Sequence, residues 1–116
     1  MKLVIDRKKW GRGELFGMLL NDAGKMCCLG FLGLACGLPE NVIRDVAMPA
    51  NVFGKSAKRN NDKWAKMINR GGGDDSTRLA KSLAVINDNT NTSDKQKERK
   101  ITQKFKTIGV DVKFKN

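Results

Sequence analysis

The 116-residue sequence predicts an α+β fold, in which a buried central helix packs with a small sheet formed by the two ends of the chain. Three patterns support this fold class. Residues 2–6 and 110–114 alternate apolar and polar side chains, as half-buried strands do. Residues 26–37 contain no charged residue and are apolar on every side, which is typical of a buried helix. Residues 93–108 carry apolar side chains at helical spacing, with Gly109 as the stop signal.

The two terminal strands are expected to pair with each other, because each is too short to be stable alone. In the central helix, Gly30, Gly33 and Gly37 follow at i, i+3 and i+7, so they are expected to share one face. Glycine costs a helix up to about 1 kcal/mol per position relative to alanine. Three glycines therefore predict that another stretch of backbone packs closely against this face.

Three to four further helices are expected. Pro39 suits the first turn of a short helix over 39–46, and apolar spacing predicts helices over 62–69 and 76–87. Ser93 or Thr92 is expected to cap the last helix. The glycines of 71–73 are interpreted as a connector inside one domain that spans residues 1–116.

The composition argues against an enzyme. The chain has no histidine, which excludes Ser-His-Asp and Cys-His arrangements and the common zinc sites. Its three cysteines are an odd number, and their spacing suits neither a disulfide nor a metal site. They are expected to be reduced thiols in the core, although a reactive Cys27 beside Lys25 is a minor alternative. We expect no catalytic residue, no metal and no cofactor.

No membrane segment is expected. The chain reaches Asp6 and three more charges by Lys9, so it lacks the long apolar stretch of a secretory signal. Residues 26–39 are too few to cross a bilayer. The sequence therefore predicts a cytoplasmic protein.

The charge predicts a binding surface for a polyanion. The formal net charge is +11, and the basic residues gather in 1–12, 55–70 and 93–116. Pairing of the terminal strands would bring the first and third stretches together, and such a surface attracts phosphate backbones. The alternative is that these lysines only solvate helix faces. The residues expected to contact nucleic acid are Lys8, Lys9, Arg12, Lys58, Arg59, Lys63, Lys66, Arg70, Lys97, Lys100 and Lys104.

A second hypothesis is a site for a small ligand such as a nucleotide signal. Trp10 could stack on a base and Arg12 could bind phosphate, while Asn87 and Asp88 form a polar turn beside them.

Four segments resemble a known family. They are residues 10–14 (Trp-Gly-Arg-Gly-Glu), 24–32 (Gly-Lys-Met-Cys-Cys-Leu-Gly-Phe-Leu), 86–88 (Ile-Asn-Asp) and 108–114 (Ile-Gly-Val-Asp-Val-Lys-Phe). The chain resembles an uncharacterised family of small proteins encoded by bacteriophages and prophages. The resemblance implies a strand, a cysteine-bearing central helix, an Asn-Asp turn and a helix followed by a strand.

These observations predict a non-enzymatic phage accessory protein that acts by binding. Its basic surface is expected to contact nucleic acid or a nucleoprotein or defence complex of the host, for example as a CRISPR inhibitor would. The alternatives are the nucleotide-binding protein described above and a structural component of the virion.

Overall fold

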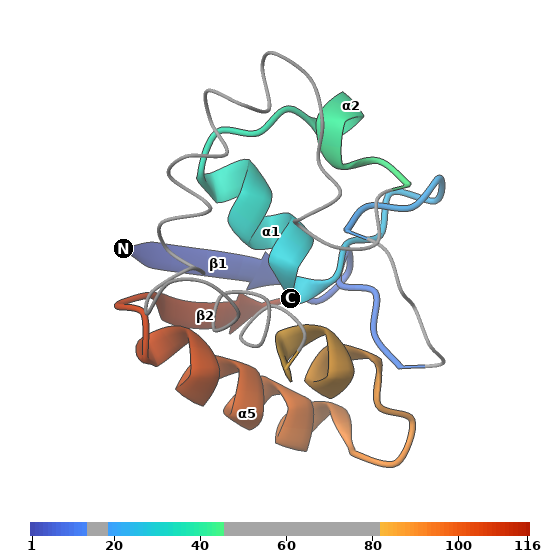
Figure 1. Ribbon diagram of the computed structural model, residues 1–116. Coiled ribbons are helices and arrows are strands. Elements are labelled where there is room, and N and C mark those ends of the chain that lie inside the picture. Colours follow the sequence, from blue (N-terminus) through green and yellow to red (C-terminus); the bar gives the residue numbers. More distant parts are fainter. Residues whose placement is uncertain (14–18, 46–81) are drawn as a thin grey trace.

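The computed structural model describes residues 1–13, 19–45 and 82–116, and its fold is α+β (Figure 1). The elements in chain order are strand β1 (Lys2–Asp6), helix α1 (Cys28–Ala35), short helix α2 (Glu40–Ile43), helix α5 (Asp94–Lys106) and strand β2 (Asp111–Lys115). Residues 82–88 are also helical. The predicted helix over 62–69, the start of the one over 76–87 and the connector 71–73 lie outside the described residues.

The two terminal strands pair, as predicted, and they run parallel. Leu3 lies beside Val112 and Ile5 beside Phe114, so these four side chains share one face of the sheet. Leu3 and Ile5 are buried on that face, whereas Val4 between them is exposed. The alternation that predicted the strands therefore also identifies which face of the sheet meets the core.

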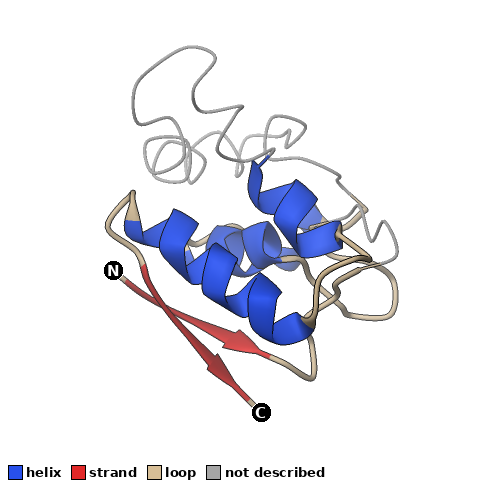
Figure 2. Ribbon diagram, turned by 90° about the horizontal axis from the view of Figure 1, so that it is seen from below, coloured by secondary structure: helices blue, strands red, loops and turns tan. Residues whose placement is uncertain are grey.

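The helices cover this inner face of the sheet. Helix α1 packs against β1 and α5 packs against β2, and Figure 2 shows the helices on one side of the two strands. Ile101 and Phe105 of α5 are completely buried, as their spacing predicted. The predicted buried central helix is confirmed in α1, although it is shorter than residues 26–37. None of the helices in the described segments is long and apolar enough to span a membrane.

The ends of α5 follow the predicted signals. The Ser93 side chain accepts a hydrogen bond from the backbone N–H of Gln96 at 3.2 Å, and the Gln96 side chain accepts one from the Ser93 N–H at 3.1 Å. This reciprocal capping box satisfies two N–H groups that have no partner inside the helix. Gly109 then adopts φ +77°, which lets the chain turn sharply from α5 into β2.

The glycines of the central helix have different roles, so the prediction that three of them share a helix face is only partly right. At Gly30, an added Cβ would lie 2.0 Å from the backbone oxygen of Leu19, so the segment before α1 does pack directly on the helix. Gly37 lies beyond the end of α1, with φ +97°. Its N–H binds the Leu34 carbonyl and the N–H of Leu38 binds the Gly33 carbonyl, which is the Schellman ending of a helix.

Candidate functional site

Asn87 is the centre of a buried hydrogen-bond network and is completely inaccessible to solvent. Its Oδ1 accepts from the Trp10 indole N–H at 2.7 Å and from the Cys28 backbone N–H at 3.1 Å. Its Nδ2 donates to the Gly11 carbonyl and to Asp88 Oδ1, both at 2.9 Å. These four bonds use the hydrogen-bonding capacity of the amide. Asn87 thus holds the segment after β1, the start of α1 and the helical segment 82–88 together.

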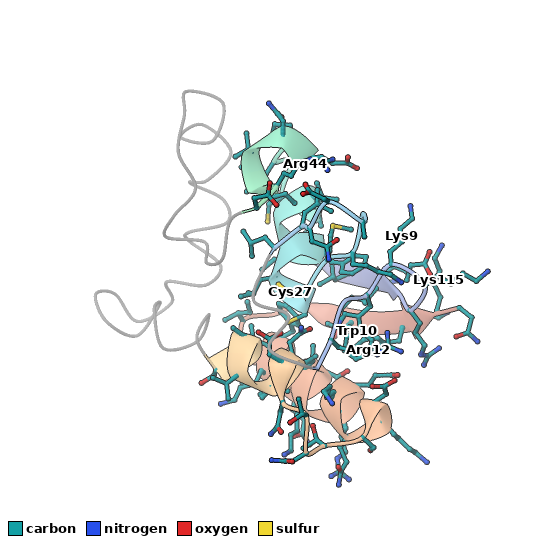
Figure 3. All side chains as sticks on the ribbon, turned by 90° about the vertical axis from the view of Figure 1, so that its right-hand side faces the viewer. Lys9, Trp10, Arg12, Cys27, Arg44 and Lys115 are labelled. Atoms are coloured by element: carbon teal, nitrogen blue, oxygen red, sulfur yellow. The ribbon has the colours of Figure 1, made fainter. Side chains whose placement is uncertain are left out.

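The four residues proposed for a small ligand do meet in the fold, but they bind one another. Asn87 and Asp88 lie in the last turn of the helical segment 82–88, not in the polar turn that was expected. Trp10 is only 2% exposed, and its ring lies 4.9 Å from that of Phe114. The guanidinium of Arg12 lies 4.4 Å from the Trp10 ring centroid, and Figure 3 shows the two side chains together between α5 and β2. The indole is therefore covered by the protein and does not present a free face to a base.

Two arginines that follow β1 form ion pairs with the two acids of α5. Arg7 makes a bidentate contact with Glu98, with Nη2 at 2.7 Å from Oε1 and Nε at 3.0 Å from Oε2. Arg12 Nη2 lies 2.9 Å from Asp94 Oδ2, and its Nη1 donates to the Arg7 and Trp10 carbonyls. Arg12 was predicted to bind a phosphate, but in the structure its guanidinium is occupied by these contacts.

The Arg12 pair makes stability depend on pH. The hydrogen bond from Arg12 holds the pKa of Asp94 below its ordinary value of 3.8. Because the folded pKa is depressed, the pair stabilises the fold above that value and is lost as the pH falls through the folded pKa. The carboxylate is largely solvated, so Asp94→Asn should cost less than about 1 kcal/mol at neutral pH. Urea unfolding at neutral and strongly acidic pH measures this difference, which should vanish in acid.

A matched control is Asp22→Asn, since Asp22 is exposed and forms no ion pair within the described segments. This variant should unfold like the wild type at both pH values. A difference between wild type and Asp94→Asn that persists in strong acid would show that the ion pair is not its source.

Because both acids are paired with arginines, the uncompensated charge that α5 presents to solvent is positive. Five exposed cations remain on the helix, and we call them the α5 cationic surface. They are Lys95, Arg99, Lys100, Lys104 and Lys106. Figure 2, seen from below, shows α5 in front of the other helices, so this surface faces outward.

The α5 cationic surface has two flanks. At about 100° per residue, Lys95, Arg99 and Lys106 lie within about 40° of one another, on the side of α5 away from Ile101. Lys100 and Lys104 form the other flank, about 140° around the helix axis. The exposed, uncharged Gln103 lies between the two flanks. The sequence prediction omitted the first flank, although its spacing opposite the apolar stripe could have revealed it.

Lys97 does not belong to this surface, contrary to the sequence prediction. It is 3% exposed, and its ammonium group donates to the Thr92 carbonyl. The i, i+4 spacing of Lys97 with Ile101 places it on the buried side of α5, so its long apolar stem packs into the core.

A second group of exposed lysines surrounds the turn after β1. Lys25 Nζ donates to the Lys8 carbonyl at 2.6 Å, and the Arg7 N–H donates to the Lys115 carbonyl at 2.7 Å. Figure 3 shows Lys9 and Lys115 on the same side of the molecule. Arg7, at the start of this turn, binds Glu98, which lies about 120° around the helix axis from Lys104. The group therefore lies on a different side of α5 from Lys104.

The predicted nucleic-acid contacts therefore separate into groups. Lys8 and Lys9 lie at the turn, and Lys100 and Lys104 on one flank of α5. The sequence-based prediction did not include Lys25 and Lys115, because only the tertiary fold brings them close to this turn. The predicted contacts that lie outside the described residues are Lys58, Arg59, Lys63, Lys66 and Arg70.

The cysteines are core residues. All three are buried and reduced, and burial raises the pKa of the Cys27 thiol to about 12. A thiol with so high a pKa is almost fully protonated at neutral pH, which argues against the reactive Cys27 that was considered as an alternative. Within the described segments, no group of three histidine, cysteine or acidic residues could hold a metal ion.

No protein-family model, curated protein or solved structure matches the chain.

Proposed function

We propose that the protein acts by binding, and that the α5 cationic surface contacts the phosphate backbone of nucleic acid, free or within a host nucleoprotein complex. The observation that carries this proposal is the pairing of both α5 acids with Arg7 and Arg12. This pairing leaves no unpaired acid on the helix. A cationic surface of this kind gains affinity by releasing the counterions condensed on phosphates.

The arrangement of the cations favours duplex DNA. A helix in the major groove has a phosphate backbone on each side, and α5 carries a cationic flank on each side of Gln103. Glutamine is one of the side chains that can bind the edge of adenine in that groove. The major groove of duplex RNA is too deep and narrow for such an approach, and a single strand needs only one flank.

The biological setting is part of the proposal. The resemblance to bacteriophage and prophage proteins suggests an accessory protein that works in the cytoplasm of a host cell. Contact with a defence complex that holds nucleic acid, such as a CRISPR or nuclease complex, is consistent with a cationic surface. Blocking such a complex would need no catalytic group.

The test is a titration of labelled duplex DNA, followed by fluorescence anisotropy at two salt concentrations. If all five cations contact phosphates, the affinity should fall about 500-fold between about 50 and about 200 mM salt. The triple variant Lys95→Gln, Arg99→Gln and Lys106→Gln removes one flank. Its affinity should fall only about 12-fold over the same range, because it retains two contacts.

A second triple variant is the matched control. Lys8→Gln, Lys9→Gln and Lys25→Gln removes the same charge from the turn after β1 and should retain the steep salt dependence. Equal losses of affinity in the two triple variants would show that the net charge of the protein, and not the α5 cationic surface, determines binding to DNA. Absence of binding to duplex DNA at the lower salt concentration would refute the proposal, and stronger binding to single strands or duplex RNA would refute the major-groove geometry.

A further inference from the structure

Strand β1 has an open edge. The Met1 carbonyl and the Arg7 N–H bond to β2, so the odd-numbered residues of β1 direct their backbone groups towards β2. The N–H and C=O groups of Lys2, Val4 and Asp6 therefore point away from β2. Among the residues that the structure describes, none bonds these outward groups of Lys2 and Val4, and the Val4 side chain is 47% exposed.

We propose that the open β1 edges of two copies of this chain pair antiparallel around a two-fold axis at Val4. The resulting sheet has four strands in the order β2, β1, β1 and β2. In this register Val4 lies opposite Val4 of the second copy, and Lys2 lies opposite its Asp6. Val4 forms the hydrogen-bonded type of antiparallel pair with both of its backbone groups. Lys2 and Asp6 pair through the Lys2 C=O and the Asp6 N–H, because the Asp6 C=O already accepts from the Lys9 N–H at 3.0 Å.

Charge complementarity supports a second copy of this chain as the partner of the β1 edge. Within one chain, Lys2 pairs in register with Asp111, and Asp6 with Lys115. The proposed pairing extends each of these rows across four strands. One row reads Asp111 and Lys2, followed by Asp6 and Lys115 of the second copy, so the charges alternate along it. Opposite charges on directly facing residues stabilise a sheet, and like charges destabilise it.

The edge of β2 is a poorer site for a second copy. Its outward backbone groups belong to Val112 and Phe114, so the two-fold pairing with the longest overlap centres on Lys113. Lys113 would then face Lys113 of the second copy. An exposed lysine on an edge strand is a recognised way to prevent such pairing, and the centre of β1 has Val4 in its place.

The shape of the sheet also supports pairing. Parallel strands usually lie in larger sheets that are covered on both faces, whereas β1 and β2 form a pair with one exposed face. A four-stranded sheet would protect both β1 edges. The two-fold axis is perpendicular to the sheet, so both copies keep their helices on the same side. The interface does not use α5 and is independent of the proposed DNA contact.

The first test is a charge-swap series measured by sedimentation equilibrium, from about 1 µM to about 1 mM protein. The wild type should show a weak, concentration-dependent dimer. Lys2→Glu and Asp6→Lys should each weaken dimerisation about tenfold or more, because each reversal acts at two symmetry-related pairs. The double variant should restore dimerisation, since it re-creates the opposite charges between copies.

The double variant distinguishes an effect on the interface between copies from an effect on the fold of each copy. Inside one chain the double variant places the introduced glutamate beside Asp111 and the introduced lysine beside Lys115, so a purely intramolecular role predicts additive damage and no rescue. Circular dichroism checks that each variant folds. A wild type that stays monomeric at the highest concentration would overturn the proposal, as would a double variant that is no better than the single ones.

The second test is disulfide trapping. Facing residues of a hydrogen-bonded antiparallel pair have Cα atoms about 5.5 Å apart, within the range that a disulfide can bridge. Val4→Cys should therefore form a covalent dimer under mild oxidation, while the three native thiols are buried. The control is Val85→Cys, at a position that is 59% exposed on the helical segment 82–88. Equal trapping rates for the two variants would contradict the interface.

Discussion

Gly30→Ala should lower the free energy of unfolding by about 3 kcal/mol or more, because the new methyl group would overlap the backbone of another segment. The added Cβ would lie 2.0 Å from the Leu19 oxygen and 2.9 Å from its carbonyl carbon. Neither atom can move aside as a flexible side chain can, so α1 or the segment before it must shift. Without such a clash, alanine would stabilise a helix by up to about 1 kcal/mol relative to glycine. The sign of the change is therefore diagnostic, and urea unfolding measures it.

Gly109→Ala is the matched control. Gly109 adopts φ +77°, but nothing lies within 4 Å of the position that an added Cβ would take. The substitution therefore adds conformational strain without a clash and should cost about 1 to 2 kcal/mol. If Gly30→Ala proves no more destabilising than Gly109→Ala, the close approach of Leu19 to α1 is wrong.

Asn87→Ala should lower the free energy of unfolding by about 3 kcal/mol or more, because buried polar groups would lose their partners. The Trp10 indole N–H, the Cys28 N–H and the Gly11 carbonyl all bond to this amide. Each unsatisfied buried group costs about 1 to 3 kcal/mol. Urea unfolding gives the loss, and near-ultraviolet circular dichroism should show altered packing of Trp10.

The control for this variant is Asn89→Ala, two residues further along the chain. Asn89 is half-buried, and its Oδ1 accepts one hydrogen bond, from the Asn91 N–H at 2.7 Å. Its loss should cost about 1 kcal/mol. Similar costs for the two variants would mean that the network around Asn87 does not hold the three segments together.

Fewer cations are available to contact a polyanion in the folded chain than the net charge of the sequence suggests. A net charge of +11 suggests that any lysine or arginine could contact a polyanion. The structure engages Arg7 and Arg12 in ion pairs and buries Lys97, and it leaves α5 without a free acid. The folded structure thus decides which cations can contact a polyanion. The two ion pairs join residues that are far apart in the chain, with separations of 91 positions for Arg7 and Glu98 and 82 positions for Arg12 and Asp94.

The four residues of the small-ligand hypothesis also have a different role in the fold from the one that the sequence predicts. The sequence singles out Trp10, Arg12, Asn87 and Asp88 as side chains that could stack on a base, bind a phosphate or form a polar turn beside them. They are indeed together, but Asn87 lies at 0% exposure and Trp10 at 2%. An asparagine in a polar stretch looks like part of a turn. Only in the folded chain do the start of α1 and the Trp10 segment pack around Asn87, so that its side-chain amide holds these segments together.

The sequence by itself determined the local elements. Strands β1 and β2, the central helix and α5 with its Ser93 cap and Gly109 stop are encoded by side chains that are near neighbours along the chain. Their period and capping chemistry act over one or two turns, so no knowledge of the rest of the fold is needed.

The tertiary structure decided the direction of strand pairing, the close contact at Gly30 and the partners of each charge. These depend on segments far apart in sequence, whose relative placement follows from burying several apolar faces at once. The open edge of β1 and the pairing of both α5 acids, on which the two proposals rest, arise in the same way. Each is defined by what the folded chain pairs elsewhere, a property that no local pattern contains.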